Sequence, residues 1–176
     1  MIRHLVMLFL LATTLPVRSP DLSGTWMLDG FTGPGPLGMP YENAVCGAVP
    51  GPASPDGSTA AFEQATYIGD VSAELVIAQN EKTVTIDRKY GGSVASGTWK
   101  TVVNLDGSES TTANGAATSA TRGKWAESRL VIEHRVSRNG TTCAATETFE
   151  LAADGTLSVI ATQDARTSRQ TYFKKK

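Results

Sequence analysis

The sequence predicts an all-β domain, an antiparallel up-and-down meander barrel of about eight or nine strands. Apolar and polar residues alternate along many short segments after Ser72, and turn-forming residues separate these segments. No segment after Ser72 has a helical period. In addition, residues 29–70 are rich in glycine and proline, which predicts one long irregular loop after the first strand.

The first strand is expected at residues 21–28, where Leu22, Gly24, Trp26 and Leu28 alternate on one face. The other strands are short segments joined by tight turns. They are expected at residues 75–77, 83–86, 99–105, 117–125, 130–136, 141–151, 157–162 and 167–173. A meander of hairpins leaves two exposed edges, so we expect the first strand to pair with the last and close a barrel, in preference to an open sheet or a sandwich.

Residues 1–19 have the pattern of a cleavable signal peptide. Arg3 precedes an apolar run, residues 5–12, which is shorter than the ~20 residues that span a bilayer. Ser19 is a small residue suited to a cleavage site. We therefore expect residues 20–176 to form the mature domain, which would be secreted or periplasmic and without a transmembrane span.

Charge and motifs restrict the class of function. The net charge is −1, with both signs spread along the chain, whereas nucleic-acid-binding proteins carry a basic face. We therefore expect no nucleic-acid partner. The sequence has no Gly-x-Ser-x-Gly, His-Glu-x-x-His or phosphate-loop pattern, so no catalytic residue and no cofactor is assigned.

Cys46 and Cys143 are the only cysteines. In an exported protein such a pair predicts a disulfide. The bond would tie the loop segment 29–70, a candidate lid, to the barrel. Two cysteines so far apart do not make a structural zinc site by themselves, and no metal site is expected.

Gly24 and Trp26 on the first strand resemble the Gly-x-Trp signature of the lipocalin and avidin barrels. In those families the tryptophan plugs one end of the barrel, often beneath a late-strand arginine, for which Arg169 is the candidate here. Residues 124–133 and 146–155 are similar to small exported lipocalin-like proteins of bacteria. The resemblance implies a calycin-type barrel rather than a particular ligand.

A two-residue turn at Asn139-Gly140 predicts the register of the hairpin around it. The predicted pairs are Val136 with Cys143, His134 with Ala145, Ile132 with Glu147, Leu130 with Phe149 and, across the next turn, Phe149 with Val159. This face is apolar, so its polar members His134 and Glu147 are expected to point into the barrel. Arg88 should do the same, because it alternates with Ile86.

These inward-facing polar residues have two interpretations. Arg88, His134 and Glu147 form a polar cluster deep in a cavity that orients a ligand head group. Alternatively, Glu147 is a structural hydrogen-bonding group, while Arg88 and His134 reach water near the rims. Similarly, Trp99 and Trp125 either line a ligand cavity or belong to the core.

Three functions remain open from the sequence. The first is an exported binding protein for a small, partly apolar ligand held in the barrel. The second is a barrel with a filled core that acts through its surface, as a protease inhibitor or an envelope-associated partner protein. The third is an isomerase- or cyclase-type enzyme that uses His134 and Glu147 as an acid–base pair.

Overall fold

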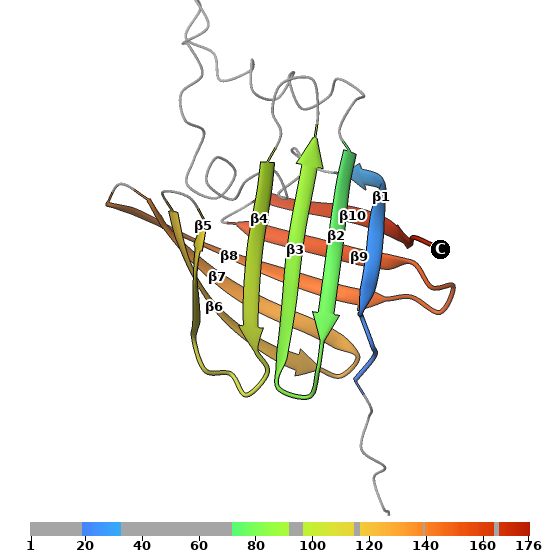
Figure 1. Ribbon diagram of the computed structural model, residues 1–176, viewed down its shortest axis with the longest axis horizontal. Helices are drawn as coiled ribbons and strands as arrows, with labels where there is room; N and C mark the ends of the chain where they lie inside the picture. The colour runs from blue at the N-terminus through green and yellow to red at the C-terminus, as the bar shows by residue number, and fades with distance from the viewer. Residues whose placement is uncertain (1–18, 33–71, 92–96, 115–116, 139, 164–165) are drawn as a thin grey trace, which may run out of the picture.

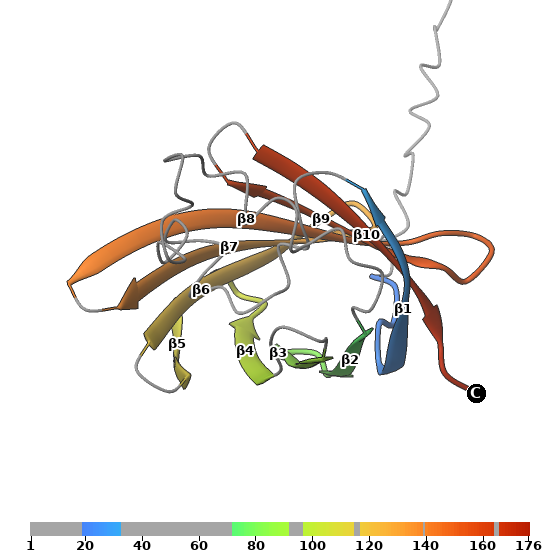
Figure 2. The ribbon, with the colours of Figure 1, turned by 90° about the horizontal axis from the view of Figure 1, so that it is seen from above.

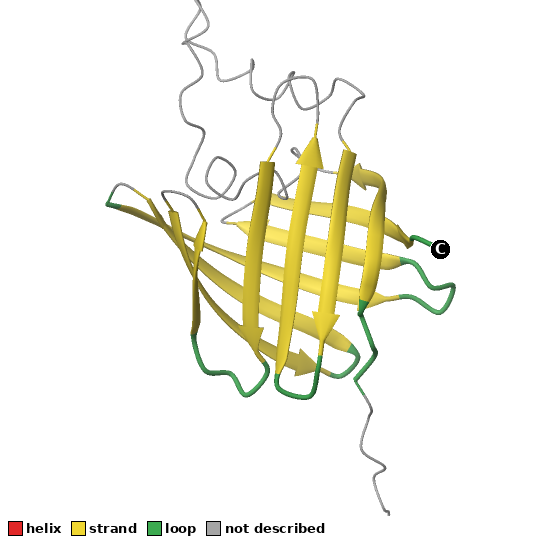
Figure 3. Ribbon diagram, in the orientation of Figure 1, coloured by secondary structure: helices red, strands yellow, loops and turns green. Residues whose placement is uncertain are grey.

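A computed structural model describes residues 19–32, 72–91, 97–114, 117–138, 140–163 and 166–176. Within these ranges every regular element is a strand (Figure 3). The strands form one antiparallel sheet that curls into a nearly closed barrel (Figures 1 and 2). The predicted signal peptide lies almost entirely outside the described residues, as does most of the predicted loop 29–70.

The ten strands follow one another along the chain. They are β1 (Gly24–Thr32), β2 (Ser72–Gln79), β3 (Thr83–Gly91), β4 (Gly97–Asn104), β5 (Ser110–Asn114), β6 (Ala117–Ala126), β7 (Arg129–Arg138), β8 (Thr141–Leu151), β9 (Leu157–Gln163) and β10 (Arg166–Lys174). We call the end where β1 finishes and β2 begins the loop end, and the opposite end the base.

The sheet has the order β4-β3-β2-β1-β10-β9-β8-β7-β6-β5. The first strand therefore pairs with the last, which confirms the predicted pairing, and the barrel is nearly closed. β1 continues to Thr32, past the predicted strand end, because its pairing with β10 resumes after a register shift between Leu28 and Gly30. β5 (Ser110–Asn114) is a strand that the sequence did not predict, since its short run of serine and threonine has no apolar alternation.

β4 and β5 are the two ends of the sheet order and do not pair with each other. Side chains from β6 close this seam instead. The Thr121 hydroxyl donates a hydrogen bond of 2.5 Å to the carbonyl oxygen of Val102 on β4. Gly123 lies so close to β4 that a Cβ atom there would overlap Cγ1 of Val103. A glycine at this position thus allows the two strands to approach.

The turns have the geometry that the sequence predicted. Gly140 and Gly155 adopt φ angles of 79° and 85°, values that glycine reaches without strain. The resulting β7–β8 and β8–β9 registers contain all five predicted pairs. The inward face of these strands was therefore correctly predicted.

Most of the apolar core lies toward the base. We call it the base cluster, and its buried members are Leu22, Trp26, Leu75, Ile77, Val84, Ile86, Val103, Leu130, Ile132, Phe149, Leu157, Val159 and Tyr172. The indole N–H of Trp26 donates a hydrogen bond of 2.9 Å to the carbonyl oxygen of Leu22. The Trp26 side chain is 1% exposed, so it fills the interior near the start of β1.

The residue above Trp26 is not the one that the resemblance implied. The Lys174 Nζ atom lies 5.4 Å from the centroid of the Trp26 ring. Arg169 is exposed, because it alternates along β10 with the inward-facing Ser168 and Gln170. The assignment of Arg169 to this position was therefore wrong, and Lys174 makes the cation–π contact.

Candidate functional site

Arg88 on β3, His134 on β7 and Glu147 on β8 meet in the barrel interior. The Glu147 Oε2 atom lies 2.6 Å from Arg88 Nη2 and 2.9 Å from His134 Nε2. The three residues are 4%, 3% and 2% exposed. The clustering expected in the first interpretation is present, whereas its cavity and ligand stay predictions. The alternative placement of Arg88 and His134 near the rims, in reach of water, was wrong. Both side chains are buried, and both residues lie inside their strands and not at the strand ends.

Arg88 makes two further contacts that fix its guanidinium group. Its Nη1 atom donates a hydrogen bond of 2.8 Å to the Thr101 hydroxyl on β4. Its Cζ atom lies 5.9 Å from the centroid of the Phe149 ring. A buried charge needs such partners, because it has lost its hydration. We refer to Arg88, Thr101, His134 and Glu147 as the polar cluster.

The polar cluster separates two apolar clusters along the strands. The second apolar cluster contains buried Trp99, Val136 and Ala145 with the half-buried Cys143 packed against it, and we call it the loop-end cluster. On the inward face of β7, His134 lies between Ile132 of the base cluster and Val136 of the loop-end cluster. Thr101 on β4 and Glu147 on β8 have the same intermediate position in their strands.

The two candidate tryptophans belong to different parts of the interior. Trp99 is 2% exposed and belongs to the loop-end cluster. Trp125 is only partly buried and packs against the base cluster. The structure therefore brings Trp99 to the loop-end side of the polar cluster and places Trp125 toward the base, where Gly24 and Trp26 also lie.

A second polar pair lies on β10 and was not predicted from the sequence. The Tyr172 hydroxyl donates a hydrogen bond of 2.5 Å to Gln170 Oε1, and both residues are buried. Burial raises the pKa of the Tyr172 phenol well above its usual value, so the group is neutral at physiological pH. The alternation of Ser168, Gln170 and Tyr172 was the signal that could have identified this inward face.

His134 and Glu147 lie within the distance that an acid–base pair requires. However, the same Glu147 oxygen also accepts a hydrogen bond from Arg88. A carboxylate held by a guanidinium is a weaker base, because the positive charge favours its ionised form. The arrangement suits holding a polar group in place better than removing a proton from it.

The structure describes only one of the two cysteines of the predicted disulfide. Cys143 is half-buried beside the loop-end cluster, at the end of the barrel where β1 leads into the segment before β2. Cys46 lies outside the described residues. The pairing therefore stays a prediction, and the position of Cys143 is where such a bond would hold that segment against the barrel.

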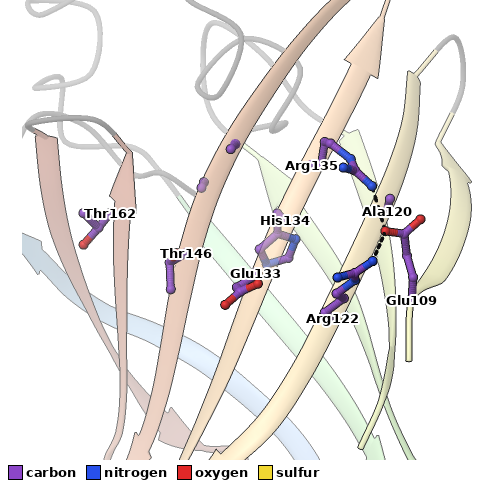
Figure 4. A pocket seen from close by; sticks show the side chains of 10 residues that line it. Glu109, Ala120, Arg122, Glu133, His134, Arg135, Thr146 and Thr162 are labelled. Carbon is purple, nitrogen blue, oxygen red and sulfur yellow. Dashed lines mark hydrogen bonds and ion pairs between the residues drawn. The ribbon is translucent and has the colours of Figure 1, made fainter. Parts of the chain in front are cut away.

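A groove of about 490 Å³ lies on the outer face of the barrel wall (Figure 4). Its outward-facing charged residues are Glu109, Arg122, Glu133 and Arg135. Both arginines reach Glu109, with nitrogen–oxygen distances of 3.4 Å for Arg122 and 2.7 Å for Arg135. These ion pairs are exposed to solvent, so they contribute little to stability.

No group of three or more histidine, cysteine, aspartate or glutamate side chains in the described ranges is arranged to hold a metal ion. No helix in the same ranges is long and apolar enough to cross a membrane.

No protein-family model matches the chain, and no curated protein sequence matches it either. Several solved structures share its fold. A REP1-NXSQ fatty acid transporter has a TM-score of 0.56 at 14% identity, covering 89% of this chain and 97% of its own. Human cRBP IV has a TM-score of 0.55 at 18% identity, with 89% and 99% covered. Lipid binding protein 8 of Caenorhabditis elegans has a TM-score of 0.57 at 12% identity, with 87% and 94% covered. At such identities the likeness establishes a calycin-type β-barrel fold.

Proposed function

We propose that this protein binds a small, partly apolar molecule inside the barrel, between the polar cluster and the loop end. Two of the solved structures that share its fold are named a fatty acid transporter and a lipid binding protein. In this chain the polar cluster would hold the head group of the ligand. Trp99, Val136 and Ala145 would contact its apolar part.

The observation that carries this proposal is the buried ion pair between Arg88 and Glu147. A barrel whose interior served only as a core would not need it, because well-packed apolar residues of similar volume are equally stabilising or better. An ion pair held between two apolar clusters instead provides a fixed polar site next to an apolar surface. Ligand sites in proteins usually combine these two features.

We further propose that the mature domain is exported, as the signal-peptide pattern of residues 1–19 indicates. A bond between Cys46 and Cys143 would hold the segment between β1 and β2 over or beside the loop end, as a lid across the opening or as a staple along the wall. N-terminal sequencing of the exported protein tests the first part, because cleavage near Ser19 should remove Met1.

Native mass spectrometry of protein purified from its own host tests the binding proposal. The wild-type protein should carry an additional small-molecule mass that is lost on denaturation. The double variant Arg88→Met, Glu147→Leu keeps an apolar interior but removes the ion pair, so it should fold and lose the ligand. Arg135→Met, on the outer face, should retain it. A wild-type protein that never carries a small molecule would contradict the proposal.

A second candidate function is a surface-acting barrel with a filled core, such as a protease inhibitor. The observation in its favour is that the inward-facing side chains of the polar cluster and both apolar clusters are almost completely buried. The outer groove beside Arg122 and Arg135 would then be part of the contact surface. Stoichiometric inhibition of a secreted protease, weakened by Arg135→Glu, would support this function over ligand binding.

A further inference from the structure

We infer that the head group of the ligand is an uncharged hydrogen-bonding group, such as an alcohol, an amide or a ketone, and not an ionised carboxylate. This inference rests on the proposed function, because it concerns the ligand of the same interior site. It follows from the buried Arg88–Glu147 ion pair and from the inward-facing hydroxyl groups near it.

The guanidinium of Arg88 and the carboxylate of Glu147, both buried in the interior, cancel in charge. Arg88 supplies one positive charge and Glu147 one negative charge, and the two groups are in contact. Tyr172 is a neutral phenol, because burial raises its pKa well above the usual value. Thr101 and Gln170 are uncharged. The Arg88–Glu147 pair therefore leaves no net charge of its own for a ligand to neutralise.

An ionised carboxylate would be poorly stabilised in this interior. It would lose its hydration on entry, and a buried anion needs a positive partner to compensate for that loss. The Arg88 guanidinium is in contact with the Glu147 carboxylate, which would repel a second anion at short range. A neutral head group avoids both penalties and can still accept or donate hydrogen bonds.

Two buried hydroxyl groups indicate that the ligand forms hydrogen bonds. Ser119 on β6 and Ser168 on β10 face inward and are 0% and 1% exposed, and neither Oγ atom has a hydrogen-bond partner among the described residues. Ser119 pairs with Val136 of the loop-end cluster. Ser168 pairs with Ala161, which in turn pairs with Glu147.

The positions of these hydroxyl groups match the proposed site. A buried hydroxyl without a partner is costly, and most buried polar groups in native proteins are satisfied. Through these cross-strand pairs Ser119 lies beside the loop-end cluster, and Ser168 lies two strands away from Glu147 of the polar cluster. A neutral ligand with oxygen or nitrogen atoms near its polar end would supply the missing partners.

A matched pair of probes tests this inference. Dodecanol and dodecanoate have the same chain length and differ in head-group charge, and both can be measured at pH 8 by displacement of an uncharged fluorescent dye. The wild-type protein should bind dodecanol more tightly by about tenfold or more, which corresponds to roughly 1.4 kcal/mol.

The variant Glu147→Gln provides the complementary measurement. It keeps a side chain of the same shape but leaves the Arg88 charge without a carboxylate, so the preference should shift toward dodecanoate by about tenfold or more. The double variant Arg88→Gln, Glu147→Gln is again uncharged and should prefer dodecanol, like the wild type. Far-UV circular dichroism checks that each variant is folded.

The outcomes separate this inference from the proposed function. Equal or tighter binding of dodecanoate by the wild-type protein would overturn the neutral head group while leaving ligand binding intact. Displacement of the dye by neither probe, together with no bound molecule in native mass spectrometry, would overturn the proposed function itself. If Glu147→Gln does not fold, the wild-type comparison alone decides.

Discussion

Arg88 on β3 and Glu147 on β8, which are 59 residues apart in the chain, form an ion pair of 2.6 Å inside the barrel. The pair links two strands that are not neighbours in the sheet. It therefore joins separate parts of the barrel wall across the interior, and it supplies the charge balance on which the proposed ligand chemistry depends.

Removal of one partner of this pair should be strongly destabilising. Arg88→Met leaves the Glu147 carboxylate buried without its guanidinium, and we expect a loss of about 3–5 kcal/mol in the free energy of unfolding. The double variant Arg88→Met, Glu147→Leu should recover most of that loss. Chemical denaturation measures both. Arg135→Met, which breaks an exposed pair with Glu109, is the control and should cost less than about 1 kcal/mol. A small effect of Arg88→Met would contradict the buried pair.

Trp26→Ala should destabilise the base of the barrel. The indole is 1% exposed and hydrogen-bonded to Leu22, so its loss should cost ~3–5 kcal/mol, as for other large-to-small core substitutions. Phe173 on β10 is 50% exposed, and Phe173→Ala should change stability by no more than ~0.5 kcal/mol. A loss below about 1 kcal/mol for Trp26→Ala would place the indole on the surface.

Gly123→Ala should strain the seam between β4 and β6. A Cβ atom at this position overlaps Val103 Cγ1, and overpacking of this kind costs about 1–3 kcal/mol. Combining it with Val103→Ala should give a loss smaller than the sum of the two single losses, because the smaller side chain makes room. Gly30→Ala, where a Cβ would meet nothing within 4 Å, is the matched control. Strictly additive losses would show that the two positions are not in contact.

A bond between Cys46 and Cys143 should be found by non-reducing peptide mapping of the exported protein. Chain entropy alone gives about 4–5 kcal/mol as the upper estimate of its stabilisation. Reduction should increase proteolysis between β1 and β2 before it affects the hairpins after Ser72. Free thiols at both positions in the exported protein would contradict the bond.

Stability should fall in strongly alkaline solution through Tyr172. Its pKa is raised in the folded protein by burial, so the folded state disfavours the phenolate and the unfolded state ionises first. The contribution of the protonated Tyr172 to the free energy of unfolding is fully present below about pH 10, the ordinary tyrosine pKa, and is lost progressively above it.

Comparison with Tyr172→Phe isolates this contribution. The variant is less stable at neutral pH, because Gln170 loses the hydroxyl donor. Its melting temperature should nevertheless fall less between pH 8 and pH 11 than that of the wild type. Parallel curves for the two proteins would show that the phenol ionises as it does in water.

The local features of this barrel could be predicted from the sequence. Period-two alternation placed His134 and Glu147 on the inward face, and the turn at Asn139-Gly140 gave the β7–β8 register that the structure has. Both signals are local, because strand pleat and turn type depend on a few neighbouring residues. β5 was missed for the same reason, since its Ser110–Asn114 segment has no apolar alternation of its own.

The sequence by itself therefore determined most of the meander, the β7–β8 register, the Phe149–Val159 pair across the next turn, and the inward positions of Arg88, His134 and Glu147. Only the tertiary structure decided which of those residues meet. The contact between Arg88 and Glu147, the position of Lys174 over Trp26 and the close approach at Gly123 all join strands that are distant in the chain. Such contacts depend on how the whole sheet tilts and closes, a global property that no short stretch of sequence contains.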